Sequence, residues 1–359
     1  MNGRDTRLDK VRARLAETDA DALLVTNLTN VRYLTGFSGT NAQVLVTGSG
    51  AYFFSDPRYA ARAAELVQGA EVLIYPSKLT DLLPQRVAEL GITRLGVEAK
   101  SMTLFERDQL GNALDGAQLV GTSDVVEDLR RAKDSEEIAL MREAIRIADE
   151  GFDWVVDRLV PGASESEIAL DLEVHMRRQG AEAVSFEPIV GSGPLSAHIH
   201  HAPSERTLEK GDTVLLDFGA RWHGYCSDLT RTVVLGPASD EQRELYEVVL
   251  EAQRAGIAAV SAGAGGAEVD AAARRIIDDA GHGEDFGHGL GHGVGLDIHE
   301  APRLHKTSDD ALIEGDVVTV EPGIYVRGQA GVRIEDCVVV TSGAADVLTA
   351  TPKDDLIEL

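Results

Sequence analysis

Two aspartates flank one turn of this chain in a pattern that could hold a cation. Asp217 and Asp228 lie in VLLDFGARWHGYCSDLTRTVVL, which reads as two apolar strands joined by a turn. A turn at residues 222–223 sets Asp217 opposite Asp228 on one face of an antiparallel pair. Opposed Cβ atoms lie about 4.5 to 5.5 Å apart, and like charges in such pairs are destabilising. The first hairpin therefore needs a bound cation or a shifted carboxyl pKa.

A second hairpin repeats this arrangement with glutamates. In VTVEPGIYVRGQAGVRIEDCVVV, folding about Gly328 sets Glu321 opposite Glu335. Four acidic side chains on apolar strands are unusual, because isolated charges are costly to bury. Bound cations account for all four carboxylates at once, so we expect a metal centre.

The stretch DFGHGLGHGVGLDIHE, between the two hairpins, adds an imidazole. Glycine occupies every second position from 287 to 295, and His288 and His292 alternate with these glycines. One side of the stretch is thus bare, so its backbone can approach another segment closely. Carboxylates with an imidazole and no thiolate suit Mn²⁺, Co²⁺ or Zn²⁺. Two divalent cations balance four carboxylates and a hydroxide better than one cation does.

Length, charge and cysteine content restrict the class of protein. The chain has 359 residues, 43% of them hydrophobic, which is enough for two cores. A net charge of -26 argues against nucleic acid or an anionic membrane as a partner. The N-terminal stretch reads as a charged amphipathic helix without the apolar segment of a signal peptide, so we expect a cytoplasmic protein. Cys226 and Cys337 are expected to stay reduced and buried.

The order of expected elements predicts two domains. Residues 1 to about 125 alternate short apolar strands with helical stretches, which is typical of an α/β domain with a mixed or parallel sheet. We place the boundary near 125–133 and assign the domains as 1–128 and 129–359. The second domain follows one plan twice: two helices, then strand-rich sequence ending in a carboxylate-bearing hairpin. Two pseudo-symmetric halves that share one site are expected, with the first helix ending at Gly151.

Five motifs of the second domain resemble those of the pita-bread metallopeptidases, which include methionine aminopeptidase, aminopeptidase P and prolidase. The motifs are LLDFGA, YCSDLTRT, GHGLGHGVGLDIHE, VEPGIY and GVRIED. In the first domain, NVRYLTGFSGTNA and FSDPRY resemble the creatinase-type domain of the proline-specific branch. The resemblance spans nearly the whole chain. It implies an α/β (α+β) protein with a creatinase-like N-terminal domain and a pseudo-symmetric pita-bread C-terminal domain.

The resemblance also implies a ligand set. Asp217 corresponds to a ligand of one metal, and His292 and Glu321 correspond to ligands of the other. Asp228 and Glu335 correspond to carboxylates that bridge the two ions. We expect two divalent ions, with Mn²⁺ favoured over Co²⁺ and Zn²⁺, and expect Glu321 to transfer the proton during amide hydrolysis.

Three histidines are implied on the substrate side of the site. They are His200, in SAHIHHAPSE, His299, in LDIHE, and His288. His198 and His201 stand beside His200, so the position could be filled by any of the three. The expected role of His299 and His200 is to hydrogen-bond the tetrahedral intermediate.

Arg333 resembles the arginine that steadies a bridging carboxylate in this family. It lies two residues before Glu335, on the same strand face. Tyr225 and Tyr325 also lie near the expected ligands. We interpret both tyrosines as packing residues with hydrogen-bonded hydroxyls rather than catalytic groups.

The expected substrate is a small peptide with proline second, cleaved before the proline. An Xaa-Pro dipeptidase is favoured, and aminopeptidase P acting on longer peptides is the alternative. Creatinase, which has both domains but works without metal, is disfavoured by the intact ligand set. Methionine aminopeptidase lacks the N-terminal domain, and a non-catalytic peptide-binding module is a remote alternative. A homodimer is expected because this N-terminal domain commonly mediates association.

Overall fold

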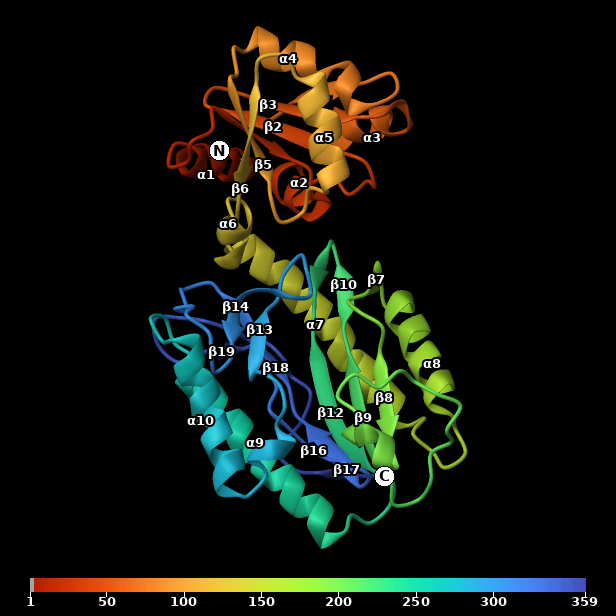
Figure 1. Ribbon diagram of the computed structural model, residues 1–359. Helices are drawn as coiled ribbons and strands as arrows, with labels where there is room; N and C mark the ends of the chain where they lie inside the picture. Colours follow the sequence, from red (N-terminus) through yellow and green to blue (C-terminus); the bar gives the residue numbers. More distant parts are fainter. Residues whose placement is uncertain (1–2) are drawn as a thin grey trace. The chain divides into compact units, whose positions relative to one another are not determined.

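The computed structural model describes residues 3–359, which divide after Arg130 into two compact units (Figure 1). Each unit has a hydrophobic core of its own. The N-terminal unit is built on one six-stranded sheet in the order β4-β3-β2-β1-β5-β6. Its strands are β1 (Ala22–Val25), β2 (Gln43–Thr47), β3 (Ala51–Ser55), β4 (Glu71–Ile74), β5 (Arg94–Glu98) and β6 (Gln118–Thr122).

This sheet is mixed, which is one of the two forms, mixed or parallel, that the sequence predicts. Strand β2 runs antiparallel to β1 and β3, whereas β4, β5 and β6 add parallel pairs. The helices along this part of the chain are α1 (Gly3–Leu15), α2 (Leu28–Thr35), α3 (Ala60–Leu66), α4 (Leu83–Glu89), α5 (Leu104–Ala113) and α6 (Glu127–Arg131). The expected alternation of strands and helices is confirmed.

Two helix pairs frame the C-terminal unit, one pair on each side of its strands (Figure 1). They are α7 (Ser135–Val156) with α8 (Glu165–Arg178), and α9 (Asp240–Ala259) with α10 (Gly266–Asp279). The predicted end of α7 at Gly151 is wrong, because the helix continues to Val156. A Cβ at Gly151 would lie 3.3 Å from Leu172 and Met176, so the glycine allows α7 to pack closely on α8.

The strands of this unit fall into two halves with separate cores. The first half contains β7 (Ala183–Val184), β8 (Ile189–Ser192), β9 (Thr213–Phe218), β10 (Ala220–Trp222), β11 (Tyr225–Cys226) and β12 (Leu229–Val234). The second half contains β13 (Gly291–Gly293), β14 (Glu300–Leu304), β15 (Val317–Val320), β16 (Gly323–Val326), β17 (Ala330–Arg333), β18 (Asp336–Val339) and β19 (Asp346–Val347). A final strand, β20 (Ile357–Glu358), pairs with β12. One core packs against α7 and α8 and the other against α9 and α10, as the repeated plan predicts.

The register of the first hairpin differs from the prediction by two residues. Asp217 lies opposite Thr230, not opposite Asp228. The turn is centred on His223 and Gly224, which both have positive φ (47° and 88°), as a tight two-residue hairpin requires. A shift of two residues keeps each side chain on its original face. Asp217 and Asp228 therefore remain on the same face.

The register of the second hairpin agrees with the prediction. Val320 pairs with Asp336 on one side of the expected glutamate pair, and Gly323 pairs with Arg333 on the other. Both pairings fit a fold about Gly328, which has φ 77°. Glu321 and Glu335 lie between these two ladders.

The glycine-rich stretch uses its bare side as expected, although only 291–293 form a strand. A Cβ at Gly291 would lie 2.0 Å from the carbonyl oxygen of Thr319, and one at Gly293 would lie 2.3 Å from that of Ala301. Backbone approach this close is possible only without a side chain. The glycines thus bring His292 between β14 and β15.

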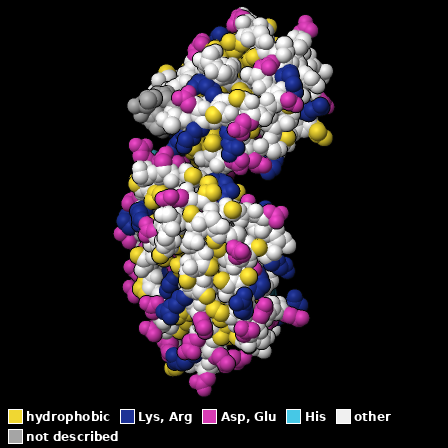
Figure 2. All heavy atoms as spheres, turned by 90° about the vertical axis from the view of Figure 1, so that its left-hand side faces the viewer, with side chains coloured by type: hydrophobic (Ala, Val, Ile, Leu, Met, Phe, Trp, Pro, Cys, Tyr) yellow, Lys and Arg dark blue, Asp and Glu magenta, His cyan; other side chains and the backbone are white. Residues whose placement is uncertain are grey.

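Other sequence expectations concern the surface and the cysteines. Cys226 and Cys337 are free and buried, as expected. No helix among residues 3–359 is long and apolar enough to cross a membrane. On the face drawn in Figure 2, Asp and Glu side chains are scattered over each unit among Lys and Arg side chains.

Candidate metal centre

Three carboxylates from separate strands meet in the interior of the C-terminal unit. Asp217, Asp228 and Glu335 each offer a ligand oxygen, and these oxygens lie within 4.8 Å of one another. All three residues are buried. Asp217 lies on β9, Asp228 directly before β12, and Glu335 directly before β18. The two halves of the unit thus contribute to one cluster.

Two of these carboxylates have one oxygen fixed and one open. Oδ2 of Asp217 accepts a hydrogen bond from Arg333 Nη2 at 2.5 Å, and Oε2 of Glu335 accepts one from Thr230 Oγ1 at 2.7 Å. Oδ1 of Asp217 and Oε1 of Glu335 are buried without a hydrogen-bond partner. Buried acceptors without partners are rare in folded proteins. These two oxygens are therefore candidates to bind a cation.

His292 presents a lone pair to the same space. Its Nδ1 donates to the carbonyl oxygen of Gly293 at 3.0 Å, which leaves Nε2 facing the carboxylates. Nε2 lies 3.4 Å from Glu321 Oε1 and 3.6 Å from Asp228 Oδ2. Burial lowers the pKa of His292 to about 4, so the imidazole is neutral at pH 7 and its Nε2 keeps a free lone pair. A backbone carbonyl that fixes the other ring nitrogen is typical of a metal-binding histidine.

The carboxyl groups of the cluster resist ionisation when no cation is present. Burial, with the charges of Glu335 and Asp217, raises the pKa of Asp228 well above its usual range. Burial, with Glu321 and Asp217, does the same for the pKa of Glu335. Burial raises the pKa of Glu321 to about 8. A divalent cation would compensate these charges, so the donor set fits a hard or borderline metal ion.

Arg333 links the cluster to His288 through a tyrosine. Arg333 Nη1 donates to Tyr325 Oη at 2.7 Å, and Tyr325 Oη lies 2.8 Å from His288 Nε2. His288 Nδ1 donates to the carbonyl oxygen of Gly289, and burial lowers the pKa of His288 to about 3. Nε2 is then unprotonated and accepts the hydroxyl proton of Tyr325. The hydroxyl of Tyr325 is hydrogen-bonded as predicted, but its partners, Arg333 and His288, were not predicted.

Arg333 contacts a different carboxylate from the one expected. It donates to Asp217 directly and reaches Glu335 only through Thr230, whose Oγ1 accepts from Arg333 Nε at 3.1 Å. Thr230 was not among the predicted residues. The corrected hairpin register places it opposite Asp217, which is the signal that could have identified it.

Replacing Tyr325 with phenylalanine should destabilise the C-terminal unit. Arg333 Nη1 would lose its acceptor in a buried site, which costs about 1 to 3 kcal/mol of unfolding free energy. Urea unfolding of the metal-free protein, followed by tryptophan fluorescence, measures this effect. Trp154 and Trp222 are the two tryptophans of the chain, so the signal reports the C-terminal unit. A loss below about 0.5 kcal/mol would mean that the hydroxyl contributes no such bond.

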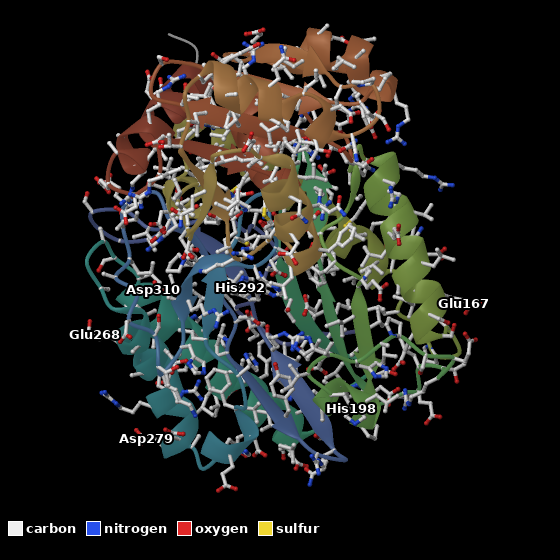
Figure 3. The ribbon with its side chains drawn as sticks, turned by 45° about the horizontal axis from the view of Figure 1, so that its top comes forward. Glu167, His198, Glu268, Asp279, His292 and Asp310 are labelled. Carbon is white, nitrogen blue, oxygen red and sulfur yellow. The ribbon has the colours of Figure 1, made fainter. Side chains whose placement is uncertain are left out.

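The predicted histidines take different positions. The ring of His299 packs edge-on against that of His292, with centroids 4.4 Å apart. The pKa of His299 is lowered by burial and then by His200, and the pKa of His288 is lowered by burial, by Arg333 and Arg274, and to a smaller extent by His200. Figure 3 shows His292 between the two halves and His198 apart from it.

His201 belongs to a separate buried cluster. Its Nε2 lies 2.8 Å from Glu165 Oε2, and the same oxygen accepts from Ser204. Glu165 Oε1 accepts from Ser192. His201 therefore ties the loop after η3 (Gly193–Ala197) to the N-terminus of α8.

Comparison with known proteins agrees with this architecture. Residues 139–342 match the metallopeptidase family M24, and residues 7–132 match the creatinase/prolidase N-terminal domain. An uncharacterized peptidase of Bacillus subtilis, YqhT, is 42% identical over 98% of this chain and 99% of its own length.

Solved structures give the same result. The Xaa-Pro dipeptidase from Bacillus anthracis is 43% identical, with a TM-score of 0.97 over 99% of this chain and 100% of its own. The X-Pro aminopeptidase from Thermotoga maritima is 35% identical, with a TM-score of 0.91 over 97% of this chain and 100% of its own. The expected fold class is confirmed. The chain belongs to metallopeptidase family M24, and it is a metal-dependent peptidase of the pita-bread fold with a creatinase/prolidase-type N-terminal domain.

Proposed function

We propose that this enzyme hydrolyses the bond before proline in Xaa-Pro peptides, with dipeptides preferred. The names of its relatives support the substrate class, because both an Xaa-Pro dipeptidase and an X-Pro aminopeptidase match nearly the whole chain. The second of these keeps aminopeptidase P as the alternative for longer peptides. A cytoplasmic homodimer remains a prediction of the sequence.

The observation that carries the proposal is the set of unpaired ligand atoms in one buried space. Ligand oxygens of Asp217, Asp228 and Glu335 lie within 4.8 Å of one another, and those of Asp217 and Glu335 include one oxygen each without a partner. Nε2 of His292 lies 3.6 Å from Asp228 Oδ2 and 3.4 Å from Glu321 Oε1. We propose that these five side chains hold two divalent ions, with Asp228 and Glu335 shared between them. Mn²⁺ is the favoured metal because the set is rich in oxygen.

The residues around the cluster have separable roles in this proposal. When bound, divalent ions polarise the scissile carbonyl and make water acidic enough to attack it at neutral pH. Glu321 accepts the proton of the attacking water and delivers it to the proline nitrogen, since that nitrogen must be protonated to leave. Arg333 holds Asp217 in one orientation. Tyr325 holds the neutral tautomer of His288.

The substrate explains why histidines are needed. An amide before proline has no N–H, so the enzyme cannot orient it through that donor. Imidazole groups of His299 and His200 instead hydrogen-bond the carbonyl oxygen, which becomes negatively charged as the carbonyl carbon becomes tetrahedral.

A three-peptide panel tests the proposed specificity. With Mn²⁺-loaded protein, kcat/KM for Ala-Pro should exceed that for Ala-Pro-Ala, and Met-Ala should not be cleaved. A preference for Ala-Pro-Ala would assign aminopeptidase P activity instead. Failure to cleave either proline peptide, with metal bound, would refute the proposal and favour a peptide-binding role.

His200→Ala should reduce kcat/KM for Ala-Pro by about a hundredfold, because the reaction loses one donor to the developing oxyanion. His198→Ala is the matched control, since His198 is also exposed and stands two residues before His200 in the chain. It should stay within about twofold of the wild type. Equal losses in both variants would contradict the assignment of His200.

A further inference from the structure

A buried arginine on β12 uses every N–H of its guanidinium group. Arg231 is 1% exposed and donates five hydrogen bonds. The acceptors are the carbonyl oxygens of Thr230 (2.9 Å), Glu335 (2.5 Å), Thr351 (2.6 Å) and Pro352 (3.1 Å), and Oδ1 of Asp336 (2.8 Å). These acceptors come from three segments: β12 itself, the start of β18, and the chain after residue 350. A saturated, buried guanidinium fixes the geometry of all three.

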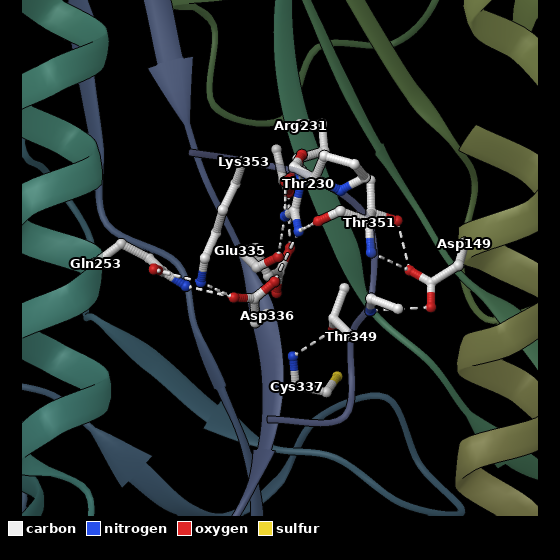
Figure 4. Close-up of polar contacts among 12 residues, drawn as sticks. Asp149, Thr230, Arg231, Gln253, Glu335, Asp336, Cys337, Thr349, Thr351 and Lys353 are labelled. Atoms are coloured by element: carbon white, nitrogen blue, oxygen red, sulfur yellow. Dashed lines mark hydrogen bonds and ion pairs between the residues drawn. The ribbon is translucent and has the colours of Figure 1, made fainter. Parts of the chain in front are cut away.

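Asp336 connects this arginine to α9. Its Oδ1 accepts from Arg231, and its Oδ2 accepts from Gln253 Nε2 at 2.8 Å and from Lys353 Nζ. Lys353 Nζ also donates to Gln253 Oε1 at 2.8 Å. The carboxylate is thus held by one residue from each half and by the C-terminal segment. Figure 4 shows these contacts around Asp336.

The C-terminal segment is also bound to α7. Thr351 N donates to Asp149 Oδ1 at 3.0 Å, and Thr351 Oγ1 donates to the same oxygen. Ala350 N donates to Asp149 Oδ2 at 3.1 Å. Asp149 lies on α7 and Gln253 on α9, so residues 350–353 join a helix of one half to a helix of the other (Figure 4).

This network ends at a proposed metal ligand. The backbone of Glu335 is held at both ends, because its carbonyl accepts from Arg231 and its N–H donates to the carbonyl of Thr230 at 3.1 Å. Its side chain accepts from Thr230 Oγ1. Strand β12, which supplies these contacts, begins directly after Asp228. The network therefore sets where Glu335 stands relative to Asp228.

We propose that Arg231, Asp336, Thr351 and Lys353 form a C-terminal clamp that positions Glu335 against Asp228 and thereby sets the affinity of the site for divalent cations. The inference rests on the proposed function of these carboxylates as metal ligands. Thr351 and Lys353 lie beyond residue 342, where the match to family M24 ends. Metal affinity would thus depend on a segment outside the matched region.

Lys353→Met tests the clamp with little change in packing. The side chain of Lys353 is 18% exposed. Methionine keeps an unbranched stem but removes the ammonium group that pairs with Asp336. Affinity for Mn²⁺, titrated into metal-free protein, should fall by about tenfold, as for other groups that orient metal ligands. KM for Ala-Pro at saturating Mn²⁺ should stay within about twofold, because the substrate-side residues are untouched.

Asp354→Asn is the matched control. Asp354 follows Lys353 in the chain and pairs with Arg254 at 2.6 Å, but its side chain is 80% exposed. Its Mn²⁺ affinity should equal that of the wild type. Thr351→Val is a second test, because it removes the hydroxyl bond to Asp149 without removing a charge, and it should also weaken Mn²⁺ binding.

The outcomes separate a positioning role from general stability. If folded Lys353→Met and Thr351→Val bind Mn²⁺ as the wild type does, the clamp proposal is refuted, even if both variants unfold at lower temperature. If Lys353→Met does not fold, Thr351→Val decides on the same criterion. A wild-type protein that binds no Mn²⁺ would instead refute the proposed function.

Discussion

Removing divalent metal from the enzyme with a chelator should reduce hydrolysis of Ala-Pro by at least about a thousandfold. Metal ions contribute several kcal/mol to such reactions, and each 1.4 kcal/mol is a factor of ten in rate. Dialysis against chelator followed by assay measures the loss. Adding Mn²⁺ should restore the activity. Full activity in protein verified as metal-free would favour the metal-independent creatinase type of chemistry and contradict a metal-dependent mechanism.

The stability conferred by metal should also depend on pH in a defined direction. In the metal-free protein the raised pKa of Glu321, about 8 against an ordinary value of 4.5, contributes stability that is complete below pH 4.5. This contribution is lost as the pH rises towards 8, and the raised pKa values of Asp228 and Glu335 act in the same direction. Bound cations offset this loss of stability at high pH, because they bind the ionised carboxylates.

The increase in melting temperature on adding Mn²⁺ should therefore be larger at pH 8 than at pH 5.5. His292 does not change this comparison, since its pKa of about 4 keeps it neutral at both values. Differential scanning calorimetry at one fixed Mn²⁺ concentration measures the difference. An equal or smaller increase at pH 8 would mean that the carboxylates are not the groups that bind metal.

Asp228→Asn should abolish peptide hydrolysis without destabilising the metal-free protein. The amide removes a buried carboxyl that interacts unfavourably with Glu335, Asp217 and Glu321, so urea unfolding at pH 8 should need an equal or higher urea concentration. Activity should fall by at least about a thousandfold, because a proposed metal ligand is lost. Opposite effects on stability and activity are the signature of a functional carboxylate.

The control for Asp228→Asn is Asp354→Asn, the same substitution at an exposed position. It should retain wild-type activity and metal content. Wild-type turnover by Asp228→Asn with both metals bound would contradict the role proposed for Asp228.

Much of the fold follows from local sequence signals. Capping boxes predict the starts of α7, α8 and α9, because Asp134, Ser164 and Ser239 each satisfy the N–H of the third residue of the helix. The predicted end of α7 at Gly151 was wrong, because a glycine in a helical pattern can mark either the end of the helix or a close packing contact. Only the position of α8 in space distinguishes a helix end from a packing contact, and the local sequence does not give that position.

The site was predictable to the extent that side chains alternate along strands. The predicted register of the first hairpin was wrong by two residues. Asp217 and Asp228 still lie in one cluster, because a shift by an even number of residues keeps each side chain on the same face of the sheet. Gly224 could have indicated the true turn, because both central residues of such a turn need positive φ and glycine adopts it most easily.

Residues that orient the ligands were harder to predict than the ligands themselves. Tyr325 lies diagonally across the hairpin from Arg333, but the register shows only that the two are within reach, not that the hydroxyl accepts from Arg333. Arg231 joins β12 to a segment about 120 residues later in the chain. No periodicity in the sequence reports a contact of that range.

The most direct test is an anomalous diffraction map of crystals soaked in Mn²⁺. We predict two manganese peaks among the five side chains Asp217, Asp228, His292, Glu321 and Glu335, with Asp228 and Glu335 within coordinating distance of both. A map with no manganese among these side chains, from crystals of active enzyme, would contradict this prediction.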